Sequence, residues 1–191
     1  MLKILELFSA EPYIAKSNEY AKAMRYKSIK SANTRNWTNN TDITNSHFVG
    51  KIGELHFAYI VALGISDFPE PSCKVGLYGD KGVDFSYNGI TIDVKTCVNN
   101  GKINRVQYLK IPVTKIIADI YSLVVYYPLT NQCKYVGSVT AQEIRQECYY
   151  NSNCSLKLRD NEWYYWINEQ IVGDNINKNI HKMLKKDIQY L

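Results

Sequence analysis

The sequence predicts a single α/β domain with a central mixed β-sheet flanked by helices, and three features support this fold class. An Asn-Gly pair within 84–95 separates two alternating apolar and polar runs, which indicates a two-residue β-hairpin. Residues 118–127 are rich in β-branched and aromatic side chains and predict a buried strand, and 134–139 predict another. The apolar pattern upstream of the hairpin predicts a helix over 47–64.

The length of 191 residues and a hydrophobic fraction of 46% predict one domain, residues 1–191, with its own core. We expect the core over about 47–150, with an N-terminal helical extension, mainly a helix over roughly 12–31, and a basic C-terminal extension. Residues 33–46 are predicted to form a polar loop. A capping box at 140–143 predicts a further helix toward residue 150, and 161–167 predict a late strand.

The hairpin fixes the relative positions of two carboxylates and one amine. With Asn88 and Gly89 as the turn, counting outward pairs Asp84 with Asp93, and the pleat places Lys95 on the same face as Asp93. Like charges directly opposite each other destabilise a sheet, so a divalent cation is expected to hold them. The alternative is a solvent-exposed hairpin whose acids point into water. The other face is apolar and is expected to meet the core: Phe85, Tyr87, Ile90, Ile92 and Val94.

Glu54 lies on the expected 47–64 helix, and its neighbours at helical spacing are apolar or small: Gly50, Phe57, Ala58 and Val61. A carboxylate on such a face is costly to bury and tends to neutralise or to bind a cation. Glu54 is therefore another candidate site residue. The alternatives are a Glu paired with a core Lys or Arg, or a Glu at the helix surface.

The order of these residues resembles the PD-(D/E)XK nuclease superfamily: Glu54 on a helix, Asp84 before a hairpin, and a D-x-K run over 93–95. Val83 stands where the family often has a Pro. The similarity covers roughly residues 47–145, because the predicted strand, strand and helix after the hairpin also fit. The resemblance implies a restriction-endonuclease-like fold.

The resemblance also implies a role for each residue. Asp84 and Asp93 would bind Mg²⁺, with the backbone carbonyl of Val94 as a further ligand, and Glu54 would complete or support the site. Lys95 would orient the attacking water and stabilise charge on the phosphate. The implied function is a Mg²⁺-dependent DNA endonuclease that hydrolyses phosphodiester bonds, and Mn²⁺ is expected to substitute. The alternative is a catalytically inactive nucleic-acid-binding or structural module on the same fold.

Charge is compatible with DNA as the partner, because the net charge is +5 and the pI is about 8.8. Basic residues cluster in the N-terminal helix and in the C-terminal tail, where the expected phosphate contacts are Lys178, Lys182, Lys185 and Lys186. The alternative for either cluster is a solvated face of an amphipathic surface helix. Cutting both strands with one active site per chain usually needs two chains, so a homodimer is a candidate assembly.

Five cysteines without a C-x-x-C pair argue against a disulfide framework and against a zinc site. No segment approaches the length of a membrane span, and residues 1–8 are too short and too charged for a secretory signal. We therefore expect a cytoplasmic protein without a membrane partner.

Overall fold

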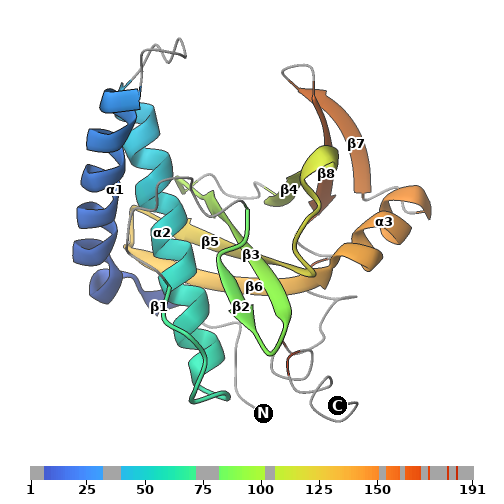
Figure 1. The fold of residues 1–191 in the computed structure, drawn as a ribbon, viewed down its shortest axis with the longest axis horizontal. Coiled ribbons are helices and arrows are strands. Elements are labelled where there is room, and N and C mark those ends of the chain that lie inside the picture. The colour runs from blue at the N-terminus through green and yellow to red at the C-terminus, as the bar shows by residue number, and fades with distance from the viewer. Residues whose placement is uncertain are drawn as a thin grey trace.

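The computed structural model describes residues 7–31, 40–71, 82–101, 106–150, 154–159 and 162–168, together with Val172, Ile180 and Leu184. The elements follow one another along the chain (Figure 1) as β1 (Phe8–Ser9), α1 (Glu11–Ser31), α2 (Asn40–Ala62), β2 (Phe85–Tyr87), β3 (Ile90–Val98), β4 (Tyr108–Pro112), the 3₁₀ helix η2 (Val113–Lys115), β5 (Ile120–Tyr127), β6 (Gln132–Thr140), α3 (Ala141–Tyr150), β7 (Cys154–Arg159) and β8 (Glu162–Asn168).

The central sheet has five strands in the order β1-β6-β5-β3-β2. Strands β3 and β5 are parallel, and the other neighbouring pairs are antiparallel, so the predicted mixed sheet is confirmed. A parallel pair needs a long crossover between its strands. Here the crossover contains β4 and η2, and β4 belongs to a second sheet of order β4-β8-β7.

Two apolar clusters pack on the two faces of the central sheet. Helix α2 packs on one face through residues such as Phe57, which contacts Phe85 of β2, and α1 lies outside α2 (Figure 1). The other face packs against the second sheet and α3, through residues such as Ile111 and Ile144. The expectation of a sheet flanked by helices is therefore correct for the first face, whereas a second sheet covers much of the other.

Helix boundaries were predictable where local signals mark them. Helix α1 spans Glu11–Ser31, close to the predicted 12–31, and α3 begins directly after the Thr140 cap. The Glu143 amide donates to Thr140 Oγ1 at 3.1 Å, and the Thr140 amide donates to Glu143 Oε2 at 2.9 Å. Within the described ranges, none of the helices combines the length and the apolar character that crossing a membrane requires.

The predicted loop over 33–46 is wrong from residue 40 onward, because α2 begins at Asn40. Its first two turns are Asn- and Thr-rich, and these residues lower helix stability by only a few tenths of a kcal/mol each, so an adjoining helix can extend through them. Residues 32–39, including Trp37 in that loop, lie outside the described part of the chain.

Close packing of α2 on β3 fixes the position of the hairpin. Gly53 faces Thr96 so closely that a Cβ at residue 53 would lie 1.8 Å from Thr96 Oγ1 and 2.9 Å from Thr96 Cβ. Only a residue without a side chain allows this contact. By contrast, a Cβ at Gly50, one turn earlier in the same helix, would meet no atom within 4 Å.

Replacing Gly53 by Ala should therefore destabilise the protein by about 1–3 kcal/mol, the usual range for overpacking. The matched control, Gly50→Ala, should leave stability unchanged or raise it by up to about 1 kcal/mol, because Ala favours the helix more than Gly does. Urea unfolding of both variants measures the difference. Equal stability of the two variants would show that α2 does not approach β3 at Gly53.

His56 is enclosed by aromatic rings on the same face of the sheet. The side chain is fully buried, and its ring lies 5.8 Å from that of Phe8 and 6.0 Å from that of Tyr13, measured between centroids. Neither ring nitrogen forms a hydrogen bond within the described structure. Burial lowers the pKa of His56 from 6.5 to about 4, because the imidazolium would have to lose its hydration.

Acid should therefore destabilise the fold through His56. Between pH 6.5 and about 4 the unfolded chain takes up a proton at His56 that the folded chain does not, so stability falls as the pH falls through this window. The shift corresponds to roughly 3 kcal/mol. Urea unfolding across this pH range should show that His56→Leu has a smaller pH dependence than the wild type by about this amount. Parallel curves for the two proteins would contradict the prediction.

Candidate functional site

The β2–β3 hairpin has the predicted register. Phe85 pairs with Ile92, and Tyr87 pairs with Ile90, with Asn88 and Gly89 as the turn. Both turn residues have positive φ, 50° and 79°, as a type I′ turn requires. The five residues predicted for the apolar face belong to the α2 cluster or pack against it: Phe85, Tyr87, Ile90, Ile92 and Val94.

Asp84 lies just beyond the last ladder pair of the hairpin. Its amide donates to the Ile92 carbonyl at 2.9 Å, and its Oδ2 accepts a hydrogen bond from the Val94 amide at 2.6 Å. The Asp84 carboxylate thus accepts a hydrogen bond from β3 at the point where the β2–β3 ladder ends. Asp84 is thereby placed beside the D-x-K run of β3, as predicted.

Asp93 and Lys95 project from the same face of β3 and form an ion pair. Lys95 Nζ lies 2.7 Å from Asp93 Oδ1 and 2.6 Å from Oδ2. The Asp93 side chain is 6% exposed, whereas that of Lys95 is 36% exposed and so reaches solvent. The expected repulsion between Asp84 and Asp93 is therefore offset by donors of the protein itself: the Val94 amide for one acid and Lys95 for the other.

The two acids fit Mg²⁺ in donor type and number. This ion commonly takes one or two carboxylates and completes its shell with water and substrate phosphate. A carboxylate has about four acceptor sites, so one carboxylate is able to contact a protein donor and a metal ion at the same time. Among the described residues, no three acidic, His or Cys side chains are grouped closely enough to hold one ion.

Glu54 forms an ion pair with Lys51, one helical turn earlier in α2, and the two side chains are 12% and 4% exposed. The Lys51 ammonium also lies 4.3 Å from the centre of the Tyr20 ring of α1. The alternative of a Glu paired with a core Lys therefore describes this residue. Helix α2 packs on the face of β3 that carries Val94, whereas Asp93 and Lys95 project from the opposite face.

Tyr121 is a neighbour of the site that sequence reasoning missed. It lies beside Asp93 in the parallel β3–β5 pair and is fully buried. Its hydroxyl accepts hydrogen bonds from the Ile117 and Ala118 amides and donates to the Lys115 carbonyl. Burial, followed by the charge of Asp93, raises the pKa of Tyr121, so this phenol stays protonated and holds the segment before β5 in place.

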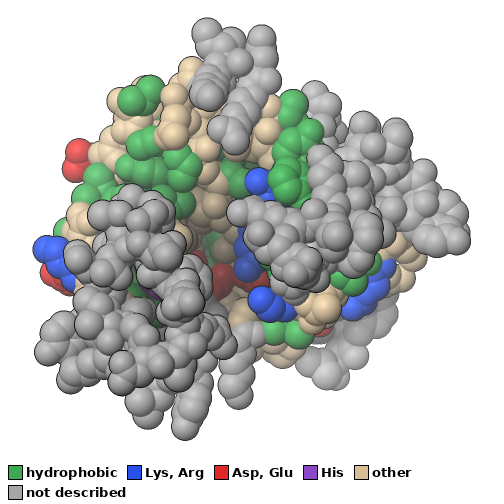
Figure 2. Space-filling model, turned by 90° about the horizontal axis from the view of Figure 1, so that it is seen from above, with side chains coloured by type: hydrophobic (Ala, Val, Ile, Leu, Met, Phe, Trp, Pro, Cys, Tyr) green, Lys and Arg blue, Asp and Glu red, His purple; other side chains and the backbone are tan. Residues whose placement is uncertain are grey.

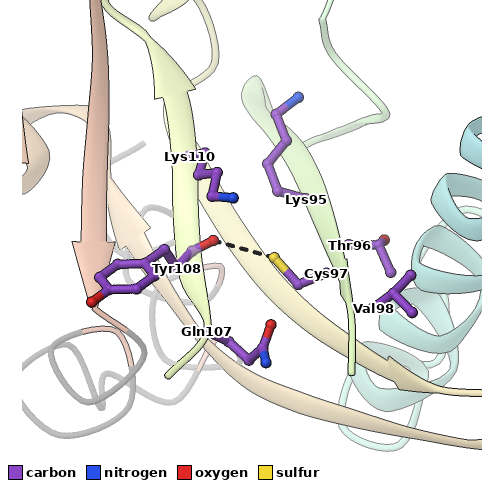
Figure 3. A pocket seen from close by; sticks show the side chains of 7 residues that line it. All are labelled: Lys95, Thr96, Cys97, Val98, Gln107, Tyr108 and Lys110. Carbon is purple, nitrogen blue, oxygen red and sulfur yellow. Dashed lines mark hydrogen bonds between the residues drawn. The ribbon is translucent and has the colours of Figure 1, made fainter. Parts of the chain in front are cut away.

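A pocket of about 350 Å³ opens between β3 and β4, next to Lys95 (Figure 3). In the same view Thr96 and Val98 point toward the helices, while Lys110 of β4 reaches toward β3. Figure 2 shows acidic and basic side chains together in a hollow of the molecule. The pocket is lined by Lys95, Thr96, Cys97, Val98, Gln107, Tyr108 and Lys110.

Lys110 was missed as a site residue although a signal was present. It alternates with the buried residues Leu109 and Ile111, a period-2 pattern that indicates a strand with one solvent-facing side. Its closeness to Lys95 depends on where β4 lies relative to the central sheet, which the local pattern does not specify. The predicted phosphate contacts of the tail lie outside the described residues: Lys178, Lys182, Lys185 and Lys186. Two apolar residues of that tail, Ile180 and Leu184, are fully buried.

A protein family described as "Family of unknown function (DUF5843)" matches residues 13–141, from α1 through the start of α3. No curated protein and no solved structure matches the chain significantly.

Proposed function

Because the chain belongs to the DUF5843 family, whose function is unknown, we propose an activity from its own residues: Mg²⁺-dependent endonucleolytic hydrolysis of DNA. The observation that carries the proposal is that Asp84 bonds the backbone amide of Val94, the residue between the ion-paired Asp93 and Lys95 on β3. Two carboxylates and one partly exposed ammonium are the groups that metal-assisted phosphodiester hydrolysis needs.

Each residue has a role that its surroundings permit. Asp84 and Asp93 would hold Mg²⁺ together with the Val94 carbonyl, and the bound ion supplies an activated water and charge neutralisation at the phosphate. Lys95, held beside Asp93, donates to a phosphate oxygen and stabilises the negative charge that develops there. Glu54 supports the site by holding Lys51 in the layer that packs on β3.

The order of the elements supports a restriction-endonuclease-like fold as part of this proposal. A helix that carries Glu54 is followed by the β2–β3 hairpin, by the buried strand β5, by β6 and by α3. This is the order that the resemblance implies for residues 47–145. The second sheet is an addition to that pattern.

A second candidate is a nucleic-acid-binding module on the same fold without catalytic turnover. One observation favours it: Glu54 is committed to an ion pair with Lys51 on the other side of β3 from Lys95. A catalytic site that required three grouped carboxylates would be incomplete here, whereas DNA binding would not depend on them.

Incubation of the purified protein with supercoiled plasmid DNA tests the proposal. We expect nicked or linear DNA in Mg²⁺ or Mn²⁺ and intact plasmid in EDTA. Asp84→Asn should remove the activity, because it replaces a metal-binding carboxylate. Intact plasmid under every condition, from a protein that still retards DNA in a gel, would favour the binding module.

A further inference from the structure

The pocket between β3 and β4 contains a lysine, Lys110, that is not among the proposed catalytic residues. Of its seven lining residues two are lysines, Lys95 and Lys110, and none is acidic. The positive charge of Lys95 is offset by its ion pair with Asp93. Lys110 forms no ion pair with any residue in the described part of the chain; its ammonium lies 4.2 Å from the centre of the Trp166 ring.

The Trp166 contact positions Lys110 without using up its hydrogen-bonding capacity. A ring face attracts an ammonium through its quadrupole, but the ammonium has three N–H donors. Tyr108, whose ring centre lies 5.7 Å from that of Trp166, lines the same pocket. Figure 3 shows the Lys110 side chain directed from β4 toward β3, across the pocket. The Lys110 ammonium thus points into the same pocket that Lys95 lines.

An anion with several oxygens is the ligand that this arrangement favours, because Lys110 forms no ion pair with the described residues and none of the residues that line the pocket is acidic. The volume, about 350 Å³, is at the small end of the range for ligand sites and suits one phosphate with part of its sugar. Because Lys95 lines the same pocket, an anion bound at Lys110 would lie next to a phosphate bound at Lys95.

We propose that this pocket binds a backbone phosphate of DNA next to the phosphate at Lys95, with Lys110 as the contacting residue. This inference rests on the proposed function for the identity of the strand. Lys110 is a binding residue rather than a catalytic one, because it contacts a phosphate that is not cleaved. Its loss should weaken DNA binding and leave the chemical step intact.

Lys110→Met tests the proposal, since it keeps the alkyl stem on Trp166 and removes the charge. Anisotropy of a short fluorescein-labelled DNA duplex, measured in EDTA over a salt series, reports binding without turnover. We expect binding to weaken by about tenfold and the slope of log K against log salt to become shallower by about 0.9, the value for one phosphate contact. Lys110→Arg should retain most of the affinity, because it keeps the charge.

Lys134→Met is the matched control, because it removes a partly buried strand lysine outside the pocket. An equal loss in this control, or an unchanged slope in folded Lys110→Met, would overturn the proposal. Absence of duplex binding by the wild type would overturn it as well.

Cleavage assays separate this inference from the proposed function. In Mg²⁺, Lys110→Met should raise KM by about tenfold and leave kcat within about twofold of the wild type. If the wild type binds DNA through Lys110 in EDTA and cuts nothing in Mg²⁺, the nuclease proposal fails and the phosphate site stands. If the wild type cuts DNA and Lys110→Met binds and cuts equally well, the phosphate site fails and the nuclease proposal stands.

Discussion

Lys95→Met is expected to lower the rate of Mg²⁺-dependent DNA cleavage by about 10²–10³-fold, the usual effect of removing one donor that stabilises transition-state charge. Lys95 forms an ion pair with Asp93 on β3, and its side chain is exposed enough to meet a substrate. The substitution should lower kcat rather than raise KM, because the charge that Lys95 stabilises grows as the phosphate is attacked. Single-turnover cleavage of a labelled duplex measures this step.

Two comparisons make this result specific. Lys134→Met removes an equal charge elsewhere in the central sheet and should cut at the wild-type rate. Lys95→Arg keeps a cation beside Asp93 but replaces a compact ammonium by a planar guanidinium, so intermediate activity is expected. Wild-type rates in a Lys95→Met protein with a normal melting curve would remove Lys95 from the mechanism.

The parts of the fold that were predicted correctly are those that depend on local sequence signals. The hairpin register follows from the turn residues Asn88 and Gly89, whose positive φ values are set within two residues. The start of α3 follows from the Thr140–Glu143 capping box. Both features depend on residues that are neighbours in the chain, so no knowledge of the rest of the fold was needed.

The second sheet could not be predicted in the same way. Strand β8 was expected from its aromatic run, but its pairing with β4 joins residues such as Ile111 and Tyr165, far apart in the sequence. The closing of such a pair depends on the long-range path of the chain. For this reason neither the pocket between β3 and β4 nor the position of Lys110 in it could be predicted from the sequence.

Within the candidate site, the positions were predictable and the partners were less so. The pleat correctly predicted that Asp93 and Lys95 share one face. The expected repulsion between Asp84 and Asp93 left out Lys95, whose ammonium offsets the charge of Asp93. For Glu54 the partner was visible in the sequence, because Lys51 lies three residues earlier, a spacing at which helical side chains meet. The cation that Glu54 meets in the structure is thus a side chain of the protein, Lys51.

Breaking the Lys51–Glu54 pair from either side should destabilise the protein by about 3–5 kcal/mol, since each change leaves one charge buried without its partner. The two side chains are 4% and 12% exposed, so little water is available to replace the lost contact. Lys51→Met and Glu54→Gln are the single variants, and urea unfolding measures them. A single variant as stable as the wild type would show that the pair contributes nothing to the fold.

The double variant, Lys51→Met with Glu54→Leu, separates a structural role of the Lys51–Glu54 pair from a direct role in cleavage. Replacing both members of a buried pair by apolar residues of similar size is often neutral or stabilising, so the double variant should recover most of the wild-type stability. If Glu54 acts only by supporting α2 against β3, the stable double variant should also cut DNA within about tenfold of the wild-type rate in Mg²⁺. A double variant that is as stable as the wild type, binds DNA and cuts none would instead show that the Lys51–Glu54 pair is needed for cleavage itself, because restored packing would then have failed to restore the chemistry.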